Sequence, residues 1–551
     1  MKNLWQLFLG MCVALGAKGC TTGPSPMAAP QWETIEIELM AEGAYINPYT
    51  EVSVVASFEN EKGETISRPA FWDGGKSWKI RFASPDPDSK WTWQTRAEPA
   101  DSGLMRSGII QAQTNSSDNK LIQAGLLTMS RGKRSVIHSN RTPFLMIGDT
   151  PWALPYRATI EQVEAYAEYR HSQGFNTALL MVVQPDMGSK GPDARNTELG
   201  FARGFADLSD GHINQMNPGY FQYLDSLIDI LLANEIVPVY QPVFHGFGWK
   251  GEGVLGNVIE PEEYVRFCRY LLGRYGSKPA MWLLAGDNGG KDPGVKEAGE
   301  MLENMDAYHQ PVGLHYNPCD DFVAEWAKKD SLKHCLHYNK SYQDKDWLDF
   351  QWAQTGHGGK HQLHKVERMY DNLPTKAVAN GEPTYEGMAD GKNGLGWWQG
   401  HEAWSQLMSG GTMGVVYGAA SLWQWKITAD EPGWTAWASQ PKSWSEALRM
   451  EGATYVGHMN RILAGLDWTD VEKHPELTED QQFLLAKPGE LYVSYLPEGG
   501  TLQIRDVPVG LPYRWVDPKT AQTKRTGKTQ EKQVFISPEK EEPMVLIVEK
   551  N

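Results

Sequence analysis

Two short segments decide how this chain is organised: Ala280-Met-Trp-Leu-Leu-Ala-Gly-Asp287-Asn288 and Thr375-Lys-Ala-Val-Ala-Asn-Gly-Glu382-Pro383. Each is a brief apolar run, too short for a helix, followed by glycine and then by an acid. This pattern is typical of a buried parallel strand that opens into a loop. In α/β barrels the carboxyl ends of such strands carry the chemistry, so Asp287 and Glu382 become the candidate functional pair. Each acid taken alone could instead cap the helix that follows it.

The sequence around these segments alternates between strand and helix patterns. Predicted strands cover residues 144–148, 176–183, 236–240, 280–287, 312–316, 333–338, 375–382 and 413–417. Predicted helices cover residues 159–173, 217–234, 262–275, 293–309, 321–329, 359–372, 396–409 and 443–463. Thr159 is expected to cap the first helix and Gly174 to end it. Eight alternations predict a closed (β/α)8 TIM barrel over residues 141–465.

Two β-rich regions flank this barrel. Short alternating strands separated by turns predict an N-terminal β-sandwich over residues 31–115, followed by a polar connector over 116–140. Residues 466–551 return to short strands and predict a second, smaller β-sandwich. Tryptophans of the first sandwich could face a sugar or fill its core, so no site is assigned to Trp72, Trp78, Trp91 or Trp93.

The first residues read as an export signal. A charged start, an apolar run to Ala17 and the following small residues predict a signal peptide over 1–20. Gly19-Cys20 resembles the end of a bacterial lipobox, with Cys20 as the lipidation site, although Ala17 and Lys18 are unusual there. Residues 21–30 then form a tether. We expect an exported lipoprotein of a Gram-negative bacterium, in the periplasm or outer membrane, with a secreted soluble protein as the alternative.

Composition narrows the class of partner. The 551 residues carry a net charge of −16 with a pI of about 5.4, which argues against nucleic acid, because phosphate binding requires clustered lysine and arginine. The 22 Trp and 22 Tyr residues weakly favour carbohydrate as the partner. The sequence contains no Cys-x-x-Cys, and the only local His-x-x-x-His, at His357 and His361, lacks a glutamate after His357, so neither metal nor cofactor is expected. Pairing of Cys319 with Cys335 and the oligomeric state stay open.

Two carboxyl groups at the ends of two barrel strands suit glycoside hydrolysis. One acid protonates the leaving oxygen, while the other attacks the anomeric carbon or activates water. Two nearby carboxylates also push each other's pKa values apart, which lets one stay protonated while the other ionises. Glu386 and Glu402 are competing acids, but Glu386 lies past the loop and Glu402 within a predicted helix, so both rank below Glu382.

With the strands numbered, a family resemblance becomes visible. Four motifs together resemble the apiosidase-like glycoside hydrolase domain of Bacteroidetes-type bacteria: Phe144-Leu-Met-Ile-Gly-Asp-Thr-Pro-Trp152, Gly174-Phe-Asn-Thr177, Trp282-Leu-Leu-Ala-Gly-Asp287 and Asn380-Gly-Glu-Pro383. The first sandwich resembles the β-domain that often precedes such barrels, and the tail is similar to the collagen-binding-type β-domain that often follows them. The resemblance implies that Asp287 is the acid/base and Glu382 the nucleophile, so Asp287 is expected to be protonated near neutral pH and Glu382 ionised.

The predicted strand ends supply candidate substrate-binding residues. These are Asp149, Trp152, His245, Asn288, His315, Tyr316, His337, Tyr338, Trp398, Trp423 and Trp425. We expect Tyr338 to hydrogen-bond Glu382, Asp149 and His245 to read sugar hydroxyls, and a tryptophan to form the platform for one ring. Each histidine could equally be a buried residue satisfied by backbone groups.

The resulting hypothesis is a retaining, exo-acting hydrolase of a plant or algal polysaccharide or oligosaccharide. Exo action rests on the family and on the long loop at 184–216, which could wall off a pocket. An endo-acting enzyme with the same acids and a non-catalytic surface glycan-binding lipoprotein remain as alternatives. An acidic glycan stays open because basic side chains lie in loops on the expected active face, at Arg157, Arg195, Arg203 and Lys250.

Overall fold

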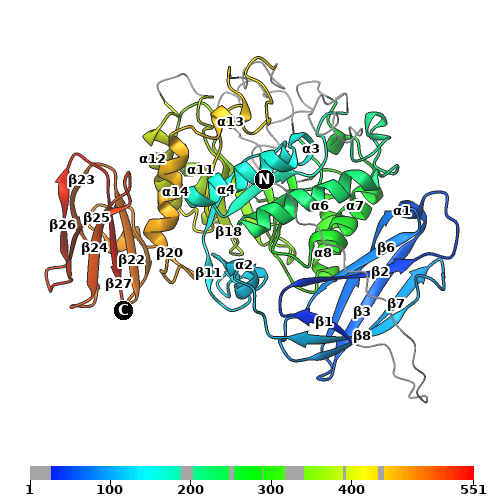
Figure 1. Ribbon diagram of the computed structural model, residues 1–551. Helices are drawn as coiled ribbons and strands as arrows, with labels where there is room; N and C mark the ends of the chain where they lie inside the picture. Colours follow the sequence, from blue (N-terminus) through cyan, green and yellow to red (C-terminus); the bar gives the residue numbers. More distant parts are fainter. Residues whose placement is uncertain are drawn as a thin grey trace, which may run out of the picture.

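The computed structural model describes residues 26–187, 203–246, 253–288, 291–316, 340–388, 393–431 and 440–550. A central barrel lies between two β-domains, one formed by the start of the chain and one by its end (Figure 1). Three hydrophobic cores match this division, one in the barrel and one in each β-domain. In the described part of the chain, no helix is long and apolar enough to cross a membrane.

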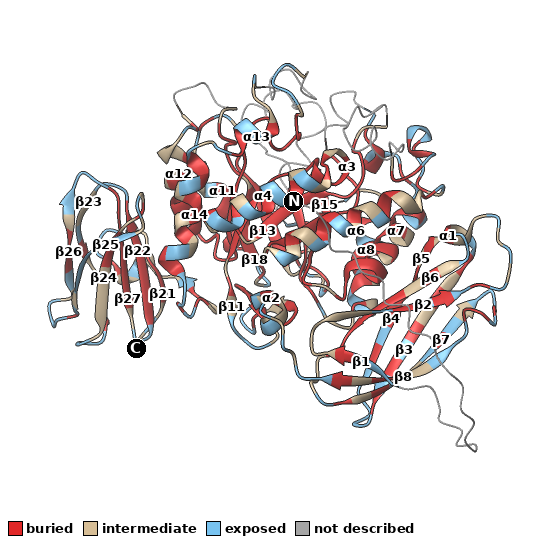
Figure 2. Cartoon of the chain, viewed as in Figure 1, coloured by how far each residue is buried: buried red, intermediate tan, exposed pale blue. Residues whose placement is uncertain are grey.

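Eight parallel strands close the predicted barrel. They are β12 (Met146–Asp149), β13 (Thr177–Met181), β14 (Val237–Gln241), β15 (Met281–Asn288), β16 (Val312–Tyr316), β17 (Phe350–Gln354), β18 (Ala377–Glu382) and β19 (Gly414–Tyr417). The barrel closes where β12 pairs with β19, with Met146 opposite Gly414. Most strand residues are buried, as Figure 2 shows at the centre of the molecule. This burial on both faces explains why the strands read as continuous apolar runs.

Helices surround the strands. They are α3 (Leu154–Arg157), α4 (Ile160–Gln173), α6 (Pro218–Ala233), α7 (Pro261–Tyr275), α8 (Val295–Met305), α11 (Leu363–Tyr370), α12 (Trp397–Met408), α13 (Trp444–Ala447) and α14 (Gly452–Leu463). Helix α4 begins at the predicted Thr159 cap, which forms a capping box with Gln162, and ends at Gly174 with φ +106°. The helix predicted over 443–463 is divided into α13 and α14. The division leaves the N–H of Gly452 free to bind Glu386.

The prediction of the sixth barrel strand is wrong. That place in the barrel belongs to β17, between β16 and β18, and not to residues 333–338, which lie outside the described residues. Polar Gln351 and Gln354 hid the true strand because they interrupt its apolar pattern. Gln351 is buried and tolerated there because its side-chain amide donates to Gln343.

The N-terminal β-domain is a sandwich of two sheets. One runs β1 (Met27–Pro30), β8 (Ser107–Gln113), β7 (Lys90–Glu98), β3 (Ser53–Asn60) and β4 (Thr65–Pro69), and the other β2 (Thr34–Met40), β6 (Ser77–Ala83) and β5 (Phe71–Gly74). A short helix, α1 (Pro48–Glu51), precedes β3. Strand β1 occupies residues expected to belong to the tether. Trp78 and Trp91 are buried in the core rather than presented on a sugar-binding face.

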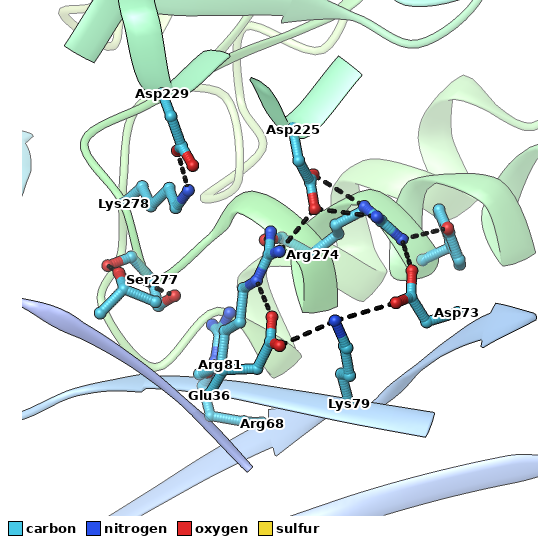
Figure 3. Close-up of polar contacts among 12 residues, drawn as sticks. Glu36, Arg68, Asp73, Lys79, Arg81, Asp225, Asp229, Arg274, Ser277 and Lys278 are labelled. Carbon is cyan, nitrogen blue, oxygen red and sulfur yellow. Dashed lines mark hydrogen bonds and ion pairs between the residues drawn. The ribbon is translucent and has the colours of Figure 1, made fainter. Parts of the chain in front are cut away.

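An ion network fixes this sandwich to the barrel (Figure 3). Asp225 of α6 accepts hydrogen bonds from Arg274 of α7 at 2.8 Å and from Arg81 of β6 at 2.5 Å. The network continues through Asp73, which pairs with Arg274 at 2.9 Å, and through Glu36, which binds Arg81 at 3.1 Å. Helices α6 and α7 directly precede β14 and β15 in the chain. The sandwich is therefore anchored to helices that lead into the strand carrying Asp287.

The remaining elements complete the two junctions. The connector forms α2 (Lys120–Ala124) and a three-stranded sheet of β9 (Leu127–Met129), β10 (Val136–His138) and β11 (Pro143–Phe144). The C-terminal domain has a six-stranded sheet, β20 (Glu472–Lys473), β21 (Leu485–Lys487), β22 (Leu491–Leu496), β27 (Met544–Glu549), β24 (Pro512–Asp517) and β25 (Gln522–Lys528), and a pair, β23 (Gly499–Gln503) and β26 (Val534–Lys540). It contacts the barrel where Tyr495 of β22 stacks on Trp404 of α12.

Candidate active site

Glu382 is the last residue of β18, and polar donors converge on it. The Tyr385 hydroxyl donates to Oε1 at 2.5 Å, and the Gln354 side-chain amide donates to Oε2. His315 Nε2 lies 3.7 Å from Oε2. The carboxylate side chain is 12% exposed, so it is largely desolvated but still reachable. Donors on both oxygens stabilise a negative charge at this position.

Burial and a second acid act against that charge. Burial raises the pKa of Glu382 most strongly, and the nearby charge of Asp287 raises it further, while the hydrogen bonds from Tyr385 and Gln354 lower it. The pKa of Glu382 is raised overall, to about 8. The two acids are therefore close enough to influence each other, and near neutral pH the pair favours holding one proton between them.

Asp287 lies at the irregular end of β15. It is 3% exposed and adopts φ +61°, a left-handed conformation that is rare for a residue with a side chain. The pairing of β15 with β16 shifts register twice, between Leu283 and Ala285 and between Ala285 and Asn288. A Cβ at Gly246 would lie 2.5 Å from the Cβ of Asp287, so only glycine fits beside the acid. Strain and tight packing at one residue are common at functional sites.

Of the predicted substrate-binding residues, Trp152 and His315 lie beside Glu382. The Trp152 ring stacks on the His315 ring with centroids 6.2 Å apart, and its indole N–H donates to Tyr385 at 2.8 Å. Burial lowers the pKa of His315 to about 3, so this imidazole is neutral at ordinary pH. Both side chains are buried against the acid rather than spread across an open platform.

Asp149 does not face the mouth of the barrel. It is fully buried, and its Oδ2 pairs with Arg170 Nε at 2.6 Å and accepts from the Tyr166 hydroxyl at 3.0 Å. The backbone N–H of Thr150 donates a hydrogen bond to Oδ1 of Asp149. The expectation that Asp149 reads sugar hydroxyls is therefore wrong, because every oxygen of this carboxylate already has a partner inside the protein.

Several other expected binding residues are packed inside the protein. His245 and Tyr316 are buried, and the Tyr316 hydroxyl donates to the carbonyl of Ser341. Trp425 is fully buried, stacks on Trp444 at 4.7 Å and donates to Gln162, so it belongs to the core. Tyr316 is buried because the side chains of a barrel strand point alternately inward and toward the helices, whereas His245 and Trp425 are buried in the segments that follow β14 and β19.

Trp398 and Trp423 hold intermediate positions. Trp398 is partly exposed and stacks on His361 at 4.1 Å, on the side of α12 that faces α11. Trp423 is 9% exposed, and its carbonyl accepts from the N–H of Ala153 in the loop that carries Trp152. The structure leaves the substrate roles of Trp398 and Trp423 untested.

The remaining sequence predictions lie outside what the structure describes. His337, Tyr338, Cys20, Arg195, Lys250, Cys319 and Cys335 are outside the described residues, as is the Asn288 side chain. Among loop cations, Arg157 is already paired with Glu431, which weakens the argument for an acidic glycan. Within the described ranges, no group of three or more His, Cys, Asp or Glu side chains could hold a metal ion.

Sequence reasoning missed two residues that bind Glu382. Tyr385 follows the acid by three residues and takes the role expected of Tyr338, a proximity that the sequence alone could have suggested. Gln354 ends the strand that was not recognised. The competing acids are structural: Glu386 binds the N–H groups of Gly396 and Gly452, and Glu402 accepts from Thr384.

The sequence matches two family models. Residues 130–470 match the model described as "Apiosidase-like, catalytic domain", which spans the barrel and more than half of the chain. Residues 28–98 match a domain of unknown function, DUF5060, which covers most of the N-terminal sandwich. No curated protein matches the sequence of this chain.

Solved structures of glycoside hydrolases share the fold. A "putative glycoside hydrolase" from Bacteroides vulgatus aligns with a TM-score of 0.69 at 15% identity, covering 95% of this chain and 100% of its own. A family 5 glycoside hydrolase from the same species aligns with a TM-score of 0.61 at 19% identity, covering 78% of this chain and 94% of its own. A third, described only as a glycoside hydrolase, gives 0.62 at 18% identity, covering 78% and 98%.

The match that carries the assignment includes the strands that end in both acids. The family model extends from β10 to the loop after α14, so Asp287 and Glu382 both lie inside it. The fold of the solved structures agrees with this assignment, including the β-domains on either side. The chain therefore belongs to the apiosidase-like family and is a glycoside hydrolase.

Proposed function

We propose that this enzyme cleaves glycosidic bonds by a retaining double displacement, with Glu382 as the nucleophile and Asp287 as the acid/base. The observation that carries the proposal is the convergence of Tyr385 and Gln354 on the two oxygens of Glu382, beside a second buried acid. Burial and Asp287 raise the pKa of Glu382 to about 8, against the expectation that this acid is ionised near neutral pH. We propose that the reactive form has Glu382 ionised, which the fixed donors favour, and the single proton of the pair on Asp287.

The chemistry then follows in two steps. Glu382 attacks the anomeric carbon while the Asp287 proton moves to the glycosidic oxygen, so the bond to the leaving group breaks and a glycosyl ester forms on Glu382. Asp287, now ionised, removes a proton from water, and the water oxygen attacks the same carbon and releases Glu382. The neutral His315 Nε2, which points at the same carboxylate, is placed to donate to a hydroxyl of the bound sugar.

The proposed substrate is a side chain of a plant or algal glycan, shortened from its non-reducing end by one sugar at a time. This proposal rests on the family and on the length of the segment between β13 and α6 in the sequence. An endo-acting enzyme would use the same two acids in an open groove. A non-catalytic glycan-binding protein would have no use for two acids held with one proton.

Sugar release from a panel of plant and algal polysaccharides and their oligosaccharides tests the proposal. We expect the wild type to release one monosaccharide and Glu382→Gln to release none. The matched control is Glu402→Gln, because Glu402 is a buried acid of α12 whose carboxylate accepts a hydrogen bond from the backbone of Thr384. Activity surviving in Glu382→Gln contradicts the assignment, oligomer ladders favour endo action, and binding without release favours the glycan-binding protein.

The anomer of the first product decides the mechanism. Proton NMR during early turnover should show the same anomeric configuration as the substrate if Glu382 forms a glycosyl ester. Azide should also restore activity to Asp287→Ala by forming a glycosyl azide of retained configuration. An inverted first product would instead assign one acid as the base that activates water.

We also propose that the chain is exported and lipidated at Cys20. The support is the charged start, the apolar run and Gly19-Cys20 at its end. Intact-mass spectrometry of the membrane fraction tests this proposal, since a lipidated product begins at Cys20 and carries acyl chains. A soluble product cleaved elsewhere, unaffected by Cys20→Ala, contradicts it.

A further inference from the structure

Trp152 contacts both neighbours of Glu382, and a hydrogen bond from its indole also lowers the pKa of the acid. It lies in the turn between β12 and α3 and is 2% exposed. Its indole N–H reaches the Tyr385 hydroxyl at 2.8 Å, and its ring stacks on His315 at an interplanar angle of 13°. Tyr385 and His315 are in turn the groups that lie beside the two different oxygens of Glu382.

The indole fixes the direction of the hydrogen bond that Tyr385 makes. An indole N–H can only donate, so the Tyr385 oxygen must accept from Trp152. The single proton of the hydroxyl is then left for Glu382 Oε1, 2.5 Å away. Without the indole, the Tyr385 hydroxyl could rotate about its C–O bond and donate its proton to Glu382 with poorer geometry. The bond from Trp152 therefore makes Tyr385 a committed donor to the carboxylate.

His315 cannot replace this donor. Its ring is neutral and its Nε2 lies 3.7 Å from Glu382 Oε2, beyond hydrogen-bonding distance, with no hydrogen-bond partner among the described residues. The stacked Trp152 ring limits how far the imidazole can move toward the acid. The hydrogen bonds that favour the charge of Glu382 consequently come from Gln354 at Oε2, from Tyr385 at Oε1 and from the Trp152 indole.

We propose that Trp152 is a positioning residue that favours the ionised form of Glu382 by orienting the Tyr385 hydroxyl and confining His315. The proposal deepens the proposed function, since it concerns the nucleophile of that reaction. Trp152, in the turn after β12, would then adjust the charge of the nucleophile. The sequence had suggested only that a tryptophan forms the platform for a sugar ring.

Trp152→Phe and Tyr385→Phe test the relay. Phenylalanine keeps an aromatic ring against His315 but removes the N–H, so the hydroxyl loses its fixed direction. We expect the pKa of Glu382 to rise by about one unit in each variant, which is about a tenfold change in the ionised fraction at low pH. The double variant should rise by less than the sum of the two single shifts, because Tyr385→Phe already removes the hydroxyl that Trp152 orients and leaves only the direct effect of the indole on Glu382.

Two measurements report this shift. The first is the carboxyl carbon resonance of Glu382 in protein labelled with 13C at glutamate Cδ, assigned by its absence from Glu382→Gln and followed through a pH titration. The second is the acidic limb of kcat/KM against pH on whichever glycan the panel identifies, which should move to higher pH. The matched control is Trp468→Phe, which removes a buried indole donating to the carbonyl of Thr412 at 2.8 Å, away from both acids.

The outcomes separate this proposal from the proposed function. A Glu382 titration that shifts in Trp152→Phe and not in Trp468→Phe, and shifts less when Tyr385 is already Phe, supports the relay even if no glycan is cleaved, in which case only the proposed function fails. An unchanged titration in folded Trp152→Phe overturns the relay even if the enzyme is active. Shifts in Trp152→Phe and Tyr385→Phe that add in the double variant also overturn it, because they would then act separately.

Discussion

Asp225 is the central acid of the network that fixes the N-terminal sandwich to the barrel, and Asp225→Asn tests what that network contributes. Both oxygens of Asp225 bind Arg274, and Oδ2 also binds Arg81 of the sandwich. The Asp225 side chain is only 15% exposed, so solvent screens these charges weakly. Asparagine keeps the size of the side chain and one acceptor but removes the charge.

The size of the effect follows from the titration of the carboxyl. Burial alone would raise the pKa of Asp225, but the charges of Arg274 and Arg81 lower it from 3.8 to about 2. Each pKa unit corresponds to about 1.4 kcal/mol, so ionised Asp225 stabilises the folded state by about 2 kcal/mol. The loss of unfolding free energy should be smaller than the about 3–5 kcal/mol that a buried, unpaired charge costs. Arg274 still pairs with Asp73, and Arg81 still pairs with Glu36.

The sign of the pH dependence is fixed by the same shift. The folded pKa lies below the unfolded value, so the stabilisation is fully present above pH 3.8 and is lost as pH falls through about 2. Urea unfolding of wild type and Asp225→Asn should therefore differ by about 2 kcal/mol near neutral pH, and the two curves should converge in strong acid.

Asp229→Asn provides the matched control. Asp229 lies one turn further along α6 and pairs with Lys278, but its side chain is 60% exposed (Figure 3). An exposed pair contributes about 0.2–1 kcal/mol and weakens in salt. Equal losses for the two variants, or a loss for Asp225→Asn that disappears at high salt, would refute the argument that the network acts as a buried unit.

Three further substitutions have distinct expected outcomes. Asp149→Asn should lower the unfolding free energy by about 3 kcal/mol, measured in urea, because Arg170 is left buried without its counter-charge; unchanged stability would return Asp149 to the substrate site. Gly246→Ala should reduce hydrolysis by about 100-fold with little loss in thermal stability, since the added Cβ displaces Asp287; full activity would refute this. Burial raises the pKa of Asp349 to about 7, so Asp349→Asn should be more stable than wild type in urea near neutral pH. That advantage should disappear below pH 3.8, where the carboxyl is protonated in both states. An equal advantage at every pH would contradict burial of the charge as its cause.

Most of the barrel could be predicted because each strand is buried on both faces. An apolar run followed by an acid reports the end of such a strand, which is why β15 and β18 were located to within a residue or two. Thr159 and Gly174 likewise mark the ends of α4 through local hydrogen bonds and backbone geometry. The apolar pattern failed at β17, where the buried side chains of Gln351 and Gln354 donate hydrogen bonds to Gln343 and Glu382.

The roles of strand-end acids were less predictable, because an acid looks the same whether it faces a substrate or an arginine. Asp149 and Asp287 both follow a short apolar strand. Asp149 is neutralised by Arg170, whose position in the last turn of α4 is equally expected for a cation that stabilises a helix end. Only packing distinguishes the two cases, and packing depends on how the last turn of α4 sits against β12.

The contacts of Glu382 show where prediction from sequence ends in this site. Gln354 reaches the acid because the pairing of β17 with β18 slips between Ala353 and Gln354, which places Gln354 opposite Glu382. A register shift of one residue turns a side chain to the other face of a strand. No pattern in residues 350–354 encodes that slip. The strand that carries the acid is therefore set by local sequence, while the donors that tune its charge are set by the register between neighbouring strands and by the turn that carries Trp152.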